Sequence, residues 1–472
     1  MLPIKPRSIK SNFLLNALRT FLSMVIPVVV FPYISRVLGP DNIGKVEFAN
    51  SIVNYFVLFA ALGIPTYGIR EIARVREDSV KFSKTVAELT MLLFITNMIC
   101  CLLFVALVLF VPMLNSQQVL FWVVFPNIIL SSFNYEWFYT GIEDQLFITV
   151  RYIIVKILQV AVIFLLVRDS ENYVIYAGLL VGANGLSSVF NIARLKKYVS
   201  FVLLKSLELR KHIKPVLVIF GSIVATSIYM QLDITMVGIF VDDNAVGLYT
   251  TANKIIRIII SVVTVLGTVM IPRLANNLAN NNVEEYRRNL SKSLNFILLL
   301  AVPFVFGCIA VADDFVVLFA GDEFAEAGFS MKLLSPIILI VGLAHFVGLQ
   351  ILYSNKKEGI YTLSVSVAAI VNFIANLILI PIYKQNGAVI GTLIAESVGL
   401  LLMSVIGRKY ISDGKFLNVK LLWYFIAGSL MFAVVVACKE YLGFGFVLQV
   451  IVAVVGYGIC VIPCRQAVLG KN

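Results

Sequence analysis

Residues 246–271 read VGLYTTANKIIRIIISVVTVLGTVMI, and this run decides the fold class of the chain. It is longer than the about 20 apolar residues that an α-helix needs to cross a bilayer. Two bases, Lys254 and Arg257, interrupt it three residues apart, and so on one helical face. A charge near the centre of a spanning helix costs about 2.5–3.5 kcal/mol. A water-filled cavity, an acidic partner or an anionic ligand must therefore offset the free-energy cost of inserting these two charges.

The composition extends this interpretation to the whole chain. Of 472 residues, 60% are hydrophobic and 14% are charged, and the mean hydropathy is +0.95. Soluble domains carry about 25% charged residues, so the sequence predicts an integral membrane protein. The bases behind the net charge of +12 lie mostly in short segments between apolar runs, which does not favour a nucleic-acid partner.

Apolar windows of spanning length recur along the chain and predict an all-α membrane protein with about fourteen transmembrane helices. They are expected near residues 12–35, 43–64, 85–112, 118–139, 147–167, 172–193, 215–240, 246–271, 292–312, 331–353, 361–380, 386–406, 420–437 and 445–463. With the N-terminus in the cytoplasm, cytoplasmic segments hold 27 of the 38 Lys and Arg residues, and external segments hold 5. This bias predicts that both termini are cytoplasmic.

Two similar pairs of segments predict an internal duplication. Gly44 and Gly247 are each followed five residues later by Ala-Asn, and Tyr139 and Tyr353 open similar polar turns. Six spans separate each pair, so both halves have the same orientation and are expected to form two pseudo-symmetric six-helix lobes around a cavity. We expect an N-terminal lobe at 1–193, a cytoplasmic basic linker on anionic lipid at 194–214, a C-terminal lobe at 215–406, and two additional C-terminal spans and a short cytoplasmic tail at 407–472.

Four bases within the predicted spans are the candidate substrate-binding residues, and we expect them to line a cationic cavity. They are Arg19, Lys156, Lys254 and Arg257. Arginine offers an anionic head group such as a pyrophosphate a bidentate fork, and lysine offers a point charge. The alternative for Lys254 and Arg257 is a structural pair with Asp233, although one acid cannot neutralise two bases.

Other ionisable residues in or near the spans leave alternatives open. The acids Glu47, Glu136, Asp233 and Glu396 could pair with bases or carry a coupling proton or Na⁺. Arg151 lies near the end of its span, where we expect it to snorkel to lipid head groups. His345 could be a proton relay or pH switch, or a hydrogen-bonded packing residue.

The chain lacks the sequence signals of catalysis. It contains no Gly-rich loop ending in Lys-Ser/Thr, and no loop is long and polar enough for a catalytic domain. The six cysteines lie in apolar segments without companion histidines, so we interpret them as small buried residues. We expect a transporter rather than an enzyme, with neither a cofactor nor a metal.

Residues 31–40, FPYISRVLGP, together with Ile43-Gly44, 61–63 (ALG) and 67–73 (YGIREIA), resemble the opening of polysaccharide flippases of the Wzx type. These flippases belong to the multidrug/oligosaccharidyl-lipid/polysaccharide exporter superfamily. The resemblance implies a bacterial inner-membrane protein that moves undecaprenyl-diphosphate-linked oligosaccharide repeat units to the periplasmic leaflet for O-antigen or a related polysaccharide. It also implies a cationic central cavity and alternating access.

The expected partners are the lipid-linked oligosaccharide, the bilayer, and a polysaccharide polymerase with its chain-length regulator; we expect the protein itself to be a monomer. Two alternatives share the architecture: a drug/cation antiporter of the same superfamily and a flippase of the peptidoglycan lipid precursor. An exporter of organic cations should favour intramembrane acids over bases, whereas bases here at least match acids. A polymerase or ligase would carry a large external loop, and the longest external loop, about 313–330, is short.

Overall fold

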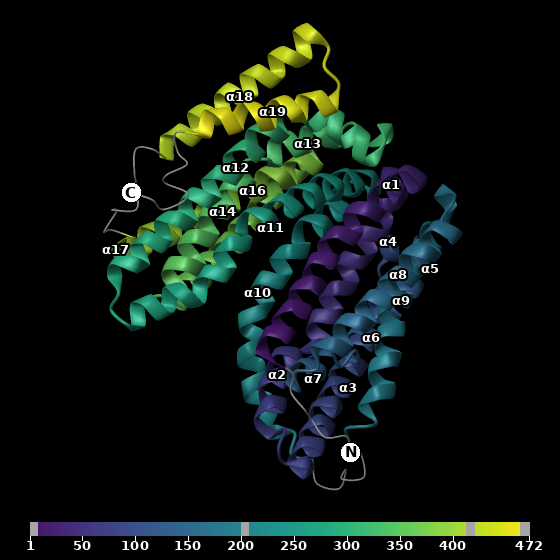
Figure 1. Ribbon diagram of the computed structural model, residues 1–472. Helices are drawn as coiled ribbons and strands as arrows, with labels where there is room; N and C mark the ends of the chain where they lie inside the picture. The colour runs from purple at the N-terminus through teal and green to yellow at the C-terminus, as the bar shows by residue number, and fades with distance from the viewer. Residues whose placement is uncertain (1–7, 200–206, 412–420, 463–472) are drawn as a thin grey trace. The chain divides into compact units, whose positions relative to one another are not determined.

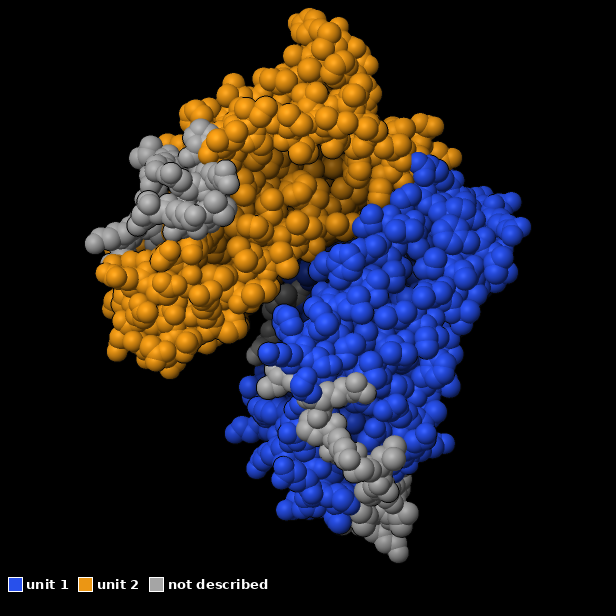
Figure 2. Space-filling view, in the orientation of Figure 1, with its two compact units in different colours: residues 1–235 blue, residues 236–472 orange. Residues whose placement is uncertain are grey.

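The computed structural model describes residues 8–199, 207–411 and 421–462, and every regular element within these ranges is a helix (Figure 1). The chain divides into two compact units, Met1–Thr235 and Met236–Asn472 (Figure 2). Within the described ranges, eleven helices are long and apolar enough to cross a membrane. The finer prediction of fourteen spans with cytoplasmic termini stays a prediction, and so do the lobe boundaries. The predicted linker at 194–214 lies partly outside the described residues.

Unit 1 consists of the helices from α1 to most of α10. Their bounds are α1 Ile9–Ala61, α2 Ile64–Val75, α3 Ser79–Phe110, α4 Pro112–Asn115, α5 Gln118–Val124, α6 Pro126–Ser132, α7 Glu136–Gly141, α8 Gln145–Leu166, η1 Ser170–Asn172, α9 Tyr173–Leu195 and α10 Arg210–Phe240. Helix α1 contains the first predicted span and most of the second. The helix is kinked at Gly39, whose φ of 71° is a positive value that glycine adopts at little cost. Pro40 then starts the next helical stretch.

The fourth predicted span, 118–139, is broken into α5, α6 and α7. Pro126 lacks the N–H that would continue α5, so it begins α6 instead. Tyr135 adopts a left-handed conformation with φ 53° and precedes α7. This second break redirects the chain and places Glu136 at the first position of α7, where it belongs to the site described below.

The core of unit 1 is aromatic and close-packed around α7. Trp137, Phe138 and Tyr139 are at most 4% exposed, and the Tyr139 hydroxyl donates to the Asn191 carbonyl at 2.6 Å. A Cβ on Gly68 would lie 2.5 Å from Cε3 of Trp137, so α2 approaches α7 closely only because residue 68 is glycine. The three residues that follow Glu136 in α7 are therefore anchored in this core.

Unit 2 consists of the helices after α10. Their bounds are α11 Asp243–Ala279, α12 Val283–Ala320, η3 Asp322–Phe324, α13 Ala327–Leu334, α14 Ile337–His345, the π-helix η4 Phe346–Tyr353, α15 Glu358–Tyr383, α16 Gln385–Ile406, α17 Arg408–Ile411, α18 Leu421–Leu442 and α19 Phe446–Val461. The predicted span 331–353 is divided between α13, α14 and η4, and Pro336 lies at the first break. Large apolar side chains remain exposed along helices of both units, as a lipid-facing surface requires.

Candidate functional site

One carboxylate joins two basic side chains in unit 1. Glu136 of α7 pairs through Oε1 with Nη1 of Arg19 in α1, and through Oε2 with Nη2 of Arg151 in α8 at 2.8 Å. Asn16 accepts a hydrogen bond from Arg19 at 3.1 Å, and Asn134 accepts one from Arg151 at 3.2 Å. Two bases share one acid, so the cluster has one formal positive charge in excess.

The prediction that Arg151 snorkels to head groups is wrong. Its side chain is 3% exposed, whereas the side chains of Arg19 and Glu136 are 24% and 35% exposed. A buried guanidinium needs acceptors, and Glu136 and Asn134 supply them inside the protein. Arg151 is therefore the buried base of the cluster, and Arg19 is the accessible one.

Lys156 extends this basic region along α8. Its Nζ donates to Oε1 of Gln159 at 2.8 Å and lies 6.0 Å from the ring centre of Tyr152. The charges of Arg19 and Glu136 also act on Tyr152, so this residue is near both the cluster and Lys156. Gln159 in turn lines a cavity of about 120 Å³ between α8 and α9. Both of these contacts are with neutral groups, so no acid among the described residues pairs with Lys156.

The other predicted bases lie in unit 2. Lys254 and Arg257 are half-buried on α11, and Nε of Arg257 donates to Oδ1 of Asn253 at 3.3 Å. Asn253 belongs to the duplicated Ala-Asn pair.

Of the remaining predicted acids, Asp233 in α10 is 6% exposed, whereas Glu47 in α1 and Glu396 in α16 are half-buried. Among the predicted site residues, the structure thus joins Arg19 to Glu136 and places Lys254 near Arg257 on one helix.

A second charged cluster in unit 1 escaped the sequence analysis. The Glu88 side chain in α3 is 0% exposed, and its Oε2 lies 2.9 Å from Nε2 of His212 and 2.9 Å from Nζ of Lys211. Its Oε1 accepts from the Glu208 backbone N–H at 2.9 Å, and the Tyr67 hydroxyl lies 2.8 Å from Nδ1 of His212. The sequence did contain a signal for this cluster, because Glu88 is an acid within the third predicted span, 85–112. This Glu88 cluster fixes the start of α10 against α2 and α3.

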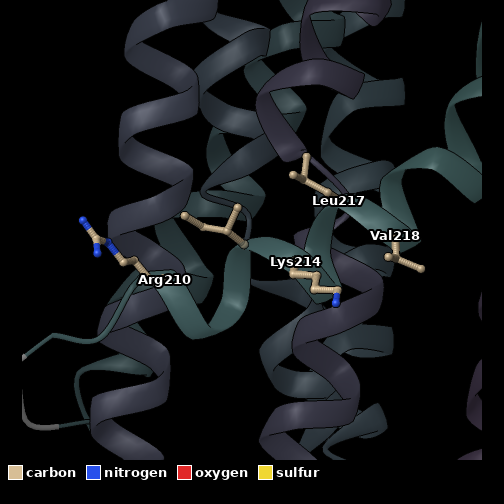
Figure 3. Close-up of a pocket in the computed structure, with 5 residues that line it drawn as sticks. Arg210, Lys214, Leu217 and Val218 are labelled. Atoms are coloured by element: carbon tan, nitrogen blue, oxygen red, sulfur yellow. The ribbon is translucent and has the colours of Figure 1, made fainter.

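The start of α10 also carries an open pocket. It measures about 620 Å³ and is lined by Arg210, Ile213, Lys214, Leu217 and Val218 (Figure 3). Bases followed by apolar residues suit a membrane border, but no predicted substrate-binding residue lines this cavity. Within the described ranges, no three His, Cys, Asp or Glu side chains are grouped to hold a metal ion.

These features define a multi-pass helical membrane protein with charged clusters packed between its helices. Its fold is similar to that of the lipid II flippase MurJ, inward closed conformation, with a TM-score of 0.74 and 15% identity over 95% of this chain and 98% of that one. It is also similar to the inward-facing conformation of a multidrug resistance MATE family transporter, with a TM-score of 0.66 and 14% identity over 84% of this chain and 95% of that one.

Residues 9–278, more than half of the chain, match the family described as polysaccharide biosynthesis protein, and the chain belongs to that family. Residues 218–382 match the MatE family. A putative O-antigen transporter of Escherichia coli (strain K12) is 22% identical over 85% of this chain and 98% of its own length. The probable low-salt glycan biosynthesis flippase Agl15 of Haloferax volcanii is 25% identical over 48% of each chain. The family resemblance is thus confirmed, and these relatives are transporters and flippases rather than enzymes.

Proposed function

We propose that the protein moves undecaprenyl-diphosphate-linked oligosaccharide repeat units from the cytoplasmic to the periplasmic leaflet of the bacterial inner membrane by alternating access, for O-antigen or a related polysaccharide. Relatives named O-antigen transporter and glycan flippase support a lipid-linked glycan as cargo. The observation that carries the proposal is the excess positive charge of the Arg19–Glu136–Arg151 cluster beside Lys156.

In this proposal the diphosphate competes with Glu136 for Arg19. Phosphate oxygens accept two parallel hydrogen bonds from a guanidinium, as a carboxylate does. Arg19 is the more exposed of the two arginines, and Glu136 keeps Arg151 when Arg19 leaves. Lys156, whose contacts are with neutral groups, adds a second charge to the same ligand. Lys254 and Arg257 are the corresponding candidates on α11, and Glu47, Asp233 and Glu396 remain candidates for ion coupling or charge pairing.

The proposal is tested in proteoliposomes that contain a fluorescent polyprenyl-diphosphate oligosaccharide, with the flipped fraction read by chemical quenching of the outer leaflet. Arg19→Gln, Lys156→Gln, Lys254→Gln and Arg257→Gln should each slow flipping by about tenfold or more, because a charge-assisted hydrogen bond contributes about 1.5–3 kcal/mol. Arg70→Gln is the matched control, since Arg70 is 64% exposed and pairs with its neighbour Glu71. Wild-type rates in both Arg19→Gln and Lys156→Gln would refute the unit 1 site.

Two other cargoes follow from the likenesses and are separated by the same vesicles. The fold of the lipid II flippase and a 22% identical relative of that name in Bacillus subtilis (strain 168) favour a peptidoglycan lipid precursor. The MatE match favours an organic cation. Faster flipping of lipid II than of the oligosaccharide lipid would show that the cargo is the peptidoglycan lipid precursor and not the oligosaccharide lipid. Cation uptake without movement of either lipid would replace the flippase by an antiporter.

A further inference from the structure

A buried polar group in unit 2 lacks protein partners. Gln350 of the π-helix η4 is 0% exposed, yet neither its Oε1 nor its Nε2 has a hydrogen-bond partner among the described residues. Nδ1 of His345, the last residue of α14, is also buried and has no partner within those ranges. Both residues lie in one candidate membrane span, Ala327–Tyr353. Buried amide and imidazole nitrogens are nearly always satisfied, so these atoms require a ligand.

The unpartnered nitrogens converge on a glycine of α11. The point where a Cβ on Gly267 would lie is 2.4 Å from Nε2 of Gln350 and 2.8 Å from Nδ1 of His345. The two lengths add to 5.2 Å, so the nitrogens are no farther apart than that. Two hydrogen bonds of ordinary length to one water molecule span about 4.6 Å. This upper limit permits a single bridging water and excludes a larger ligand between these atoms.

The local backbone is suited to such a site. Gly267 carries no side chain, and a methyl group there would collide with both nitrogens. Single π-helical turns are wider than α-helical ones and occur mostly at functional positions. Buried water molecules typically make about three hydrogen bonds to polar groups that are otherwise unsatisfied.

We propose that His345, Gln350 and the bare backbone of Gly267 form a binding site for one internal water molecule. Nε2 of Gln350 donates to the water oxygen, and the water donates to Nδ1 of His345. The water bridges His345 of α14 to Gln350 of η4, beside the bare backbone of Gly267 in α11. The site is independent of the cargo and of the basic residues of the proposed function.

The sign of a stability change tests the site. Gln350→Leu removes the donor to the water and leaves Nδ1 of His345 unsatisfied, so the Tm of the purified protein should fall by on the order of 5 °C. Without a bound water, the leucine would replace an unsatisfied amide and the Tm would rise, which would overturn the proposal. Gly267→Ala should also lower the Tm, whereas the control Gly359→Ala should not, because a Cβ there meets nothing within 4 Å.

Radiolytic labelling of the wild-type protein in H₂¹⁸O provides a test that needs no variant. A water held against the imidazole should add ¹⁸O to His345 more rapidly than to the neighbouring Phe346, which is 3% exposed. The label on His345 should fall to the Phe346 level in Gly267→Ala. Equal labelling of His345 and Phe346 in the wild-type protein would overturn the proposal even if Gln350→Leu failed to fold.

Discussion

Glu88→Gln is expected to destabilise unit 1 strongly, although the substitution changes neither the size nor the shape of the side chain. The carboxylate is wholly buried and has three donors at 2.9 Å: the Glu208 N–H, Nζ of Lys211 and Nε2 of His212. Glutamine replaces one acceptor oxygen with a donor NH₂ and removes the charge. Breaking a buried ion pair costs about 3–5 kcal/mol. Lys211 is 44% exposed and can turn to water, so we expect the low end, about 3 kcal/mol.

The assay is thermal unfolding of the detergent-solubilised protein, followed by tryptophan fluorescence. For a unit of this size, about 3 kcal/mol corresponds to a fall in Tm of roughly 6–12 °C. Glu208→Gln is the matched control, because Glu208 is 65% exposed and its ion pairs lie at the surface. The reasoning fails if Glu88→Gln unfolds within a degree of the wild type, or if the control falls by the same amount.

Three further predictions concern unit 1. Gly68→Ala should lower its stability by about 1–3 kcal/mol through overpacking against Trp137, whereas Gly182→Ala, where a Cβ meets nothing within 4 Å, should be nearly neutral in the same melts. Glu136→Gln should destabilise more than Arg19→Gln in denaturant titrations, because it strands the buried guanidinium of Arg151, whereas Arg19→Gln leaves Glu136 paired with Arg151. The hydrogen bond from Lys84 lowers the pKa of Glu208. The contribution of Glu208 to stability is therefore present above the ordinary pKa of 4.5 and is lost as the pH falls below it. When Tm is measured against pH, it should decrease less on acidification in Glu208→Gln than in the wild type.

Hydrophobic length predicted where helices lie far better than where they break. Pro126 was a visible interruption in the fourth predicted span, and it does begin a new helix. The second break in that span is made by Tyr135, whose left-handed conformation has no signal in a bulky aromatic residue. Its cause is tertiary, because α7 must turn its aromatic side chains into the core of unit 1. A single sequence does not encode that packing in any local pattern.

The candidate site was predictable in its residue types and only partly in its pairings. Depth within a span identified Arg19 and Lys156, since depth follows from chain position. The partner of a charge depends on contacts between distant helices, and for that reason Arg151 was misplaced at the lipid surface. Glu88 was overlooked for the same reason: its donors come from residues 208–212, more than 100 positions away in the chain. Neither error could be corrected by counting bases and acids.

The geometry of Glu136 gives a physical reason why Arg19 could exchange its carboxylate partner for a phosphate, as the proposed function requires. An arginine paired alone with one acid would strand that acid whenever it bound a phosphate, and the cost of the unpaired carboxylate would oppose binding. Here Arg151 holds the second carboxylate oxygen and is itself held by Asn134, so Glu136 stays neutralised when Arg19 departs. The buried arginine thus lowers the cost of releasing the accessible one. Under the proposed function the two arginines therefore have different roles: Arg151 neutralises Glu136, and Arg19 exchanges between Glu136 and the phosphate.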